Sequence, residues 1–119
     1  MITRQIILCL LFAVGLSAGQ IIFKIAADDI RGRIPFGWIW AALSPWFLTA
    51  ICLYAVITGL WIFILTELPL SRAYPFSLLG SALVPAFAVI ILGESIGLRY
   101  SLGFGLMLVG LVVIFTADQ

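Results

Sequence analysis

Residues 45–66, PWFLTAICLYAVITGLWIFILT, form a run without a charged side chain. A helix of this length rises about 33 Å at 1.5 Å per residue, close to the thickness of a bilayer's hydrocarbon core. The run begins at the pair Ser44-Pro45. Serine is a favoured N-cap residue, and proline is favoured at the first helical position. We therefore predict one membrane-spanning helix at 45–66.

The rest of the chain repeats this pattern. Three more uncharged stretches lie between its charged residues, at 5–23, 73–93 and 100–117. Each is close to the roughly 20 apolar residues that a spanning helix needs. The expected helices cover about 5–26, 45–66, 69–92 and 97–116. The sequence predicts an all-α membrane protein, a single domain over 1–119 with four transmembrane helices, in which a loop or interfacial segment precedes the second helix.

The composition excludes most other classes of protein. The chain is 65% hydrophobic and 9% charged, with a mean hydropathy of +1.31 and a net charge of +1. Soluble domains are about half apolar and a quarter charged, and nucleic-acid binding needs a basic face. The chain has no histidine, and it shows no nucleophile–base pair, metal cluster or phosphate-binding glycine loop. We expect neither an enzyme nor a cofactor, and no nucleic-acid partner.

Four spans imply a topology. The N-terminus, the 66–72 connection and the C-terminus share one membrane face, and the 27–44 segment lies at the other. Three tryptophans, Trp38, Trp40 and Trp46, cluster where that segment meets the bilayer. Tryptophan is enriched at such interfaces, so we expect an aromatic belt here.

The first predicted helix has two distinct faces. Ser17, Gln20 and Lys24 are spaced by three and four and line one face. Gly15 and Gly19 lie roughly opposite, as a Gly-x-x-x-Gly pair that lets another helix approach closely. Polar groups at membrane depth usually face a cavity or a partner, so this face is a candidate for substrate binding. Alternatively, Lys24 ends the helix and extends to the interface, while Gln20 bonds a neighbouring helix.

The third predicted helix carries a second small and polar face. Its members follow at steps of three, four and seven: Tyr74, Ser77, Ser81 and Ala88. Pro75 and Pro85 each remove an intrahelical hydrogen bond. The resulting bend is either a pivot or a static kink absorbed by packing.

The fourth predicted helix has no charge after its start. Gly103, Leu106 and Gly110 mark one stripe, which indicates packing within the fold or between copies. Four helices enclose little by themselves. Two copies, or one copy and a homologous partner, would form a groove between their polar faces, and we therefore expect a homodimer or a heterodimer.

Two acids and two arginines flank the predicted helices. Glu67 and Arg72 lie at one membrane face, where a carboxylate and a guanidinium meet the headgroup of a zwitterionic or phosphate-bearing lipid. An exposed pair of this kind also often contributes little. Glu94 lies in the connection to the last helix, where a negative charge near a helix N-terminus is favoured, with Arg99 as a potential partner.

Three segments carry a resemblance to a known family. They are AGQ at 18–20 followed by Lys24 and Ala26, LPLSRAYP at 68–75, and LGE at 92–94 running through Arg99 to Gly103-x-x-Leu106-x-x-x-Gly110. In their order and spacing they resemble the drug/metabolite transporter superfamily in its small, four-helix form. Within it, the chain is most similar to EamA-type half-units and to the ArnE/ArnF flippase subunits.

That resemblance implies a function and a set of site residues. It implies translocation of an undecaprenyl-phosphate-linked aminosugar across the bacterial inner membrane, by a dimer of four-helix subunits among membrane lipids. The headgroup of such a lipid-linked sugar, or of a polyprenyl phosphate, would cross beside the polar groups of the first and third helices. The candidate binding residues are Ser17, Gln20, Lys24, Glu67, Arg72, Tyr74, Ser77 and Glu94. The candidate packing residues are Gly15, Gly19, Gly103 and Gly110.

Two alternatives remain open. Members of the small multidrug resistance family, which export organic cations, resemble this chain in length, span number and the glycines of the last helix. Their proton-exchanging glutamate on the first helix corresponds here to Leu16, and Ser77 stands where they carry an aromatic residue. The other alternative is a membrane scaffold or accessory subunit without transport activity. A scaffold needs only the glycine faces, so the pair of Gln20 and Lys24 favours a transporter.

Overall fold

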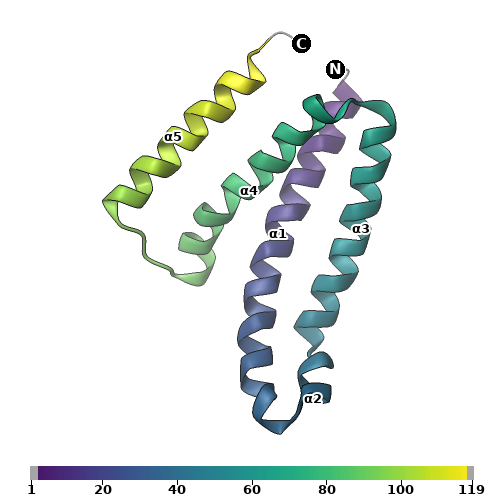
Figure 1. Cartoon of the computed structure of the whole chain (residues 1–119), viewed down its shortest axis with the longest axis vertical. Coiled ribbons are helices and arrows are strands. Elements are labelled where there is room, and N and C mark those ends of the chain that lie inside the picture. Colours follow the sequence, from purple (N-terminus) through teal and green to yellow (C-terminus); the bar gives the residue numbers. More distant parts are fainter. Residues whose placement is uncertain (1–2, 118–119) are drawn as a thin grey trace.

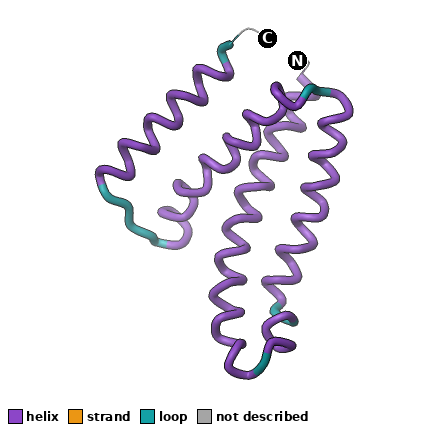
Figure 2. The backbone as a smooth tube through the Cα atoms, in the orientation of Figure 1, coloured by secondary structure: helices purple, strands orange, loops and turns teal. Residues whose placement is uncertain are grey.

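A computed structural model describes residues 3–117 as helices joined by short connections (Figure 2). The helices are α1 (Thr3–Arg33), α2 (Trp38–Ala42), α3 (Pro45–Glu67), α4 (Leu70–Leu92) and α5 (Leu98–Phe115), with a 3-10 turn at Ile34–Phe36. Four of them are long and apolar enough to cross a membrane. The expected class, an all-α membrane protein with four spanning helices, is confirmed for the described part of the chain.

In the view down the shortest axis, α5, α4, α1 and α3 follow one another across the molecule, and the start of α4 crosses α1 (Figure 1). The principal extents are 54 × 39 × 17 Å, so the molecule is thin along one axis. α1 is the central helix, packing against α3 on one side and α4 on the other, while α5 contacts α4 at the edge of the molecule. Such a thin molecule has little interior: Leu111 is the one buried residue of α5.

The core lies near the α3–α4 connection, where three helices meet. Its buried members come from α1, α3, the connection itself and α4: Cys9, Phe12, Ile57, Ile64, Leu68, Ala73 and Phe76. The rings of Phe12 and Trp61 stack at 4.6 Å between centroids. The same end of the molecule holds the N-terminal end of α1 and the C-terminal end of α5 (Figure 1), in the arrangement expected of four spans.

One close approach of two backbones fixes α4 against α1. A Cβ added to Gly80 would lie 2.8 Å from the carbonyl oxygen of Ala13 and 3.2 Å from its Cα. Real side chains essentially never come that close to a backbone, so only glycine allows this packing. Gly80 could not be identified from the sequence, because Phe76 and Val84, four positions before and after it, are large and form no small-residue repeat with it.

α1 continues to Arg33, whereas the sequence led us to expect an end near 26. Ion pairs one turn apart extend the helix beyond its apolar part. Asp28 pairs with Lys24 and Arg31, and Asp29 pairs with Arg33. Such pairs stabilise a helix, and basic residues in the last turn suit its dipole. Lys24 therefore lies inside the helix and does not end it.

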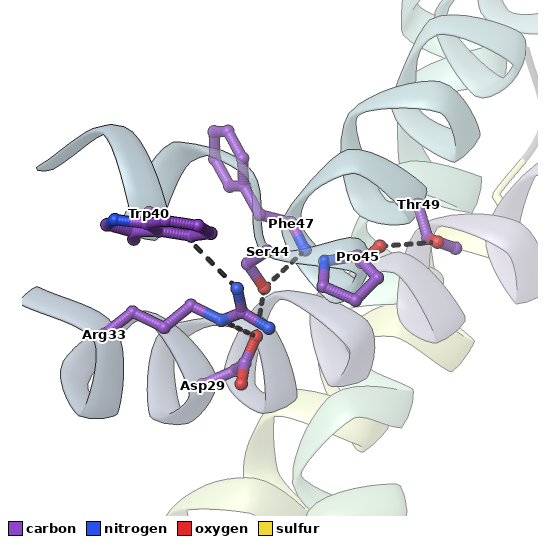
Figure 3. Close-up of polar contacts among 7 residues, drawn as sticks. All are labelled: Asp29, Arg33, Trp40, Ser44, Pro45, Phe47 and Thr49. Atoms are coloured by element: carbon purple, nitrogen blue, oxygen red, sulfur yellow. Dashed lines mark hydrogen bonds and ion pairs between the residues drawn. The ribbon is translucent and has the colours of Figure 1, made fainter. Parts of the chain in front are cut away.

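The interfacial segment before α3 is tied back to α1 (Figure 3). Ser44 is the N-cap of α3, as its sequence predicts: its hydroxyl oxygen accepts from the backbone N–H of Phe47 at 3.4 Å. The same hydroxyl donates to the Asp29 carboxylate, and Arg33 donates to that carboxylate at 3.1 Å. Arg33 also donates to the Trp40 carbonyl at 3.5 Å. We call Asp29, Arg33 and Ser44 the polar clamp.

Candidate functional site

The predicted polar face of α1 divides into three different environments. Ser17 is fully buried, and its hydroxyl donates to the carbonyls of Ala13 and Val14 at 3.0 Å each. A serine that bonds back to its own helix in this way has its donor engaged. Ser17 is thus part of the helix packing, whereas Gln20 and Lys24 are exposed.

Gln20 bridges to α3. Its side-chain amide donates to the hydroxyl of Tyr54 at 2.6 Å, and the ring of Tyr54 stacks on Phe23 at 4.6 Å. Tyr54 is not among the site residues predicted from the sequence. A polar side chain at membrane depth requires a partner on a neighbouring helix, and Tyr54 is the tyrosine that the second span carries.

Lys24 belongs to a small charged group with Asp28 and Arg31, toward the C-terminal end of α1. Its ammonium lies 3.3 Å from the carboxylate of Asp28, which also accepts from Arg31 at 2.6 Å. All three side chains are about half exposed or more. Two cations share one carboxylate, so the group keeps a net charge of +1 and can attract an anion.

Glu67 and its surroundings lie at the other end of α1. Arg4 donates to the Glu67 carboxylate at 2.8 Å, and its guanidinium lies 5.7 Å from the centroid of the Phe63 ring. The carboxylate therefore joins the start of α1 to the end of α3. Arg72, which the sequence places beside Glu67, is half-buried in the first turn of α4.

Tyr74 and Ser77 do not join Gln20 and Lys24 within one chain. α4 runs parallel to α1, and Gly80 lies against Ala13. Tyr74 and Ser77, which precede Gly80, are therefore level with the first turns of α1, far from Gln20 along the helix axis. The Tyr74 ring packs edge-on against Trp61 at 6.4 Å.

The two prolines of α4 do not interrupt it. The helix runs continuously from Leu70 to Leu92 through Pro75 and Pro85.

The four glycines predicted to pack fall into two pairs. A Cβ on Gly15 would collide with the side chain of Ile57, and one on Gly19 would lie 2.9 Å from the ring of Tyr54. Both glycines thus face α3. Gly103 and Gly110 have no atom within 4 Å of an added Cβ. They border two apolar recesses of about 280 Å³ each along α5.

Glu94 lies in the connection between α4 and α5 and borders a further recess. Among the described residues it makes no ion pair with Arg99, so the pairing considered from sequence is not formed. No group of three metal-ligating side chains occurs in residues 3–117.

Comparison with known proteins gives three informative relatives. The ArnE protein of an Enterobacter species is 33% identical over 88% of this chain and 92% of its own length. The ArnF protein of Yersinia enterocolitica is 39% identical over 74% of this chain and 69% of its own length. The chain belongs to the ArnE/ArnF family of flippase subunits.

A third member of the ArnE/ArnF family extends the comparison. The ArnE protein of Hamiltonella defensa is 37% identical over 64% of this chain, and the match spans 63% of that relative's length. All three relatives are named as probable 4-amino-4-deoxy-L-arabinose-phosphoundecaprenol flippase subunits. No protein-family model and no solved structure matches the chain. Four spanning helices and this family make it a multi-pass protein of the bacterial inner membrane.

Proposed function

We propose that the chain is one subunit of a flippase that carries an undecaprenyl-phosphate-linked amino sugar across the inner membrane. The observation that carries this proposal is the identity to ArnE and ArnF relatives along most of the chain. The thin shape of the molecule supports its role as one subunit of a larger assembly. A chain 17 Å thick along its shortest axis has little interior through which a polar headgroup could cross, and a charge in bare hydrocarbon is penalised by several kcal/mol.

A second subunit completes the proposed path. α5 buries only Leu111 within the chain, and its glycines Gly103 and Gly110 face open recesses. In lipid, small residues allow backbones of different helices to approach closely. A homologous subunit, as in a homodimer or an ArnE/ArnF-type heterodimer, would pack here and place its polar groups opposite those of this chain.

Lys24 is the proposed contact for the lipid phosphate. The group of Lys24, Asp28 and Arg31 carries a net positive charge and is exposed. A flexible ammonium can leave Asp28 for a phosphate oxygen as the headgroup enters the groove. Gln20, Tyr74, Ser77, Glu67 and Arg72 are proposed to line the remainder of the path.

Reconstitution in proteoliposomes tests the function and the role of Lys24 together. The chain and its partner subunit should translocate the phosphoundecaprenol-linked amino sugar. Lys24→Gln should reduce the rate at least tenfold without loss of folding or assembly, and Lys24→Arg should retain part of it. Arg99→Gln, which removes a positive charge elsewhere, serves as the matched control. Near-normal transport by both Lys24 variants would show that Lys24 only anchors the helix at the membrane interface.

The exporter alternative makes a different prediction. Leu16, at the place of the proton-exchanging glutamate, packs on the apolar core, and no acid replaces it on this part of α1. A pH gradient should therefore not drive efflux of a quaternary ammonium dye. Strong gradient-dependent efflux by this chain alone would favour cation export. If the flippase is active but no substitution of a polar residue in this chain changes the transport rate, the chain has an accessory role.

A further inference from the structure

Glu94 differs from the other acids of the described chain. The others have cationic partners: Glu67 with Arg4, Asp28 with Lys24 and Arg31, and Asp29 with Arg33. Within residues 3–117, the Glu94 carboxylate makes no hydrogen bond or ion pair. Its side chain is exposed in the connection between α4 and α5, so the carboxylate is free to accept a cationic ligand.

The carboxylate borders a recess of about 420 Å³ between α4, the connection and α5. This volume falls within the range of about 300–1,000 Å³ that is typical of small-molecule sites. Ser95 and Tyr100 line the recess too, and their hydroxyls have no hydrogen-bond partner among the described residues. Val84, Pro85 and Ala88 of α4 contribute an apolar wall to the recess.

The backbone around Glu94 fixes the position of this residue at the end of α4. Gly93 turns the chain at φ +69°, a left-handed conformation that favours glycine. The N–H groups of Gly93 and Glu94 both donate to the carbonyl of Ala88, which fixes Glu94 at the end of α4. The recess lies between the C-terminus of α4, which favours a cation, and the N-cap Gly97 of α5, where an anion is favoured, so the two helix dipoles oppose each other there. Arg99 is not among the residues that line the recess.

We propose that this recess binds the ammonium group of an amino sugar, with the Glu94 carboxylate as its counter-ion. The hydroxyls of Ser95 and Tyr100 would bond the sugar hydroxyls, and the wall at Pro85 would contact the C–H face of the ring. The inference rests on the proposed function and deepens it. It assigns the amine of the headgroup to Glu94, apart from the Lys24 group, since Lys24 does not line the recess.

Transport selectivity tests the site. The chain and its partner subunit are reconstituted with two probes, the phosphoundecaprenol-linked amino sugar and its N-acetyl derivative, which lacks the positive charge. Because Glu94 is exposed, its ion pair with the amine contributes modestly, and the native protein should prefer the amine by about fivefold. Glu94→Gln should lower this preference to about one without slowing transport of the N-acetyl lipid.

Two control variants accompany this test. Glu94→Asp keeps the charge and should retain part of the preference. Asp29→Asn removes one negative charge at the polar clamp and should leave the preference unchanged. A Glu94→Gln protein that still prefers the amine would overturn the ammonium site, while its transport of both lipids would leave the proposed function standing.

The failure of the proposed function has a different signature. In that case the native protein moves neither lipid. Glu94-dependent binding of a soluble amino sugar to such a protein, measured by calorimetry in lipid nanodiscs, would still support the ammonium site and would identify a soluble ligand.

Discussion

The pair α1–α3 and the pair α4–α5 are joined in different ways. Polar contacts connect α1 to α3 at three levels: Arg4 with Glu67, Gln20 with Tyr54, and Asp29 with Ser44. Among the described residues, α4 and α5 are joined by apolar contacts, including an edge-to-face pair of Phe76 and Phe115 at 5.0 Å. Open recesses lie along this second pair.

This difference follows from the physics of lipid surroundings. Lipid tails are as apolar as leucine, so hydrophobic burial does not hold helices together in a membrane. Close packing and hydrogen bonds do, and the α1–α3 pair has both. The α4–α5 pair has few of either, so its exposed surfaces are available to a ligand or a second subunit. We infer that α1 and α3 form a fixed frame, with α4 attached to it at Gly80.

The largest expected effect concerns that attachment. Gly80→Leu places a side chain against the backbone of Ala13 and should lower the free energy of unfolding by about 3 kcal/mol. The free energy of unfolding is measured by titrating the protein with sodium dodecyl sulfate in mixed micelles. Gly59→Leu is the control, because an added Cβ at Gly59 has no neighbour within 4 Å. Equal stability of the two variants would contradict the close approach of α1 and α4.

The polar clamp should give the next largest effect. Ser44→Ala removes both the N-cap of α3 and the bond to Asp29, which should cost about 1–2 kcal/mol in unfolding free energy. Thr49→Ala is the control, since Thr49 donates only to the Pro45 carbonyl within α3. If both variants lose the same amount, the clamp does not connect the two helices.

The bond between Gln20 and Tyr54 should contribute less. Tyr54→Phe keeps the ring stacked on Phe23 and removes only the hydroxyl, so we expect a loss of about 0.6 kcal/mol. A double-mutant cycle with Gln20→Leu isolates the pair and should show coupling of that size. Additive losses would mean that the 2.6 Å contact contributes nothing to stability.

The smallest effect on folding is expected in α5. Gly103→Leu and Gly110→Leu meet open space, so the unfolding free energy of the single chain should change by no more than about 0.5 kcal/mol. Association with a second subunit should nevertheless weaken, as measured by cross-linking and by light scattering in detergent. An unchanged monomer before and after substitution would refute packing between copies at this face.

Sequence reasoning was strongest for the helices and weakest for the candidate site. Uncharged runs located all four spans, and the pair Ser44-Pro45 located the start of α3. The end of α1 was misplaced, because the ion pairs of Asp28 and Asp29 prolong a helix beyond its apolar part. Glu67 was considered together with Arg72 as a contact for a lipid headgroup, and the structure adds a partner that the sequence did not indicate, Arg4 at the start of α1.

The sequence by itself determined that the chain crosses the membrane four times and that Gln20, Lys24 and Glu94 are unusual in such a chain. Hydropathy and length suffice for this, because lipid requires every spanning segment to satisfy its own backbone as a helix. Only the tertiary structure decided which of these polar groups are engaged. Partners come from whichever helices lie adjacent, and adjacency depends on close contacts such as Gly80 against Ala13. In the described part of the chain, Gln20 bonds to Tyr54, whereas the Glu94 carboxylate has no partner and borders a recess.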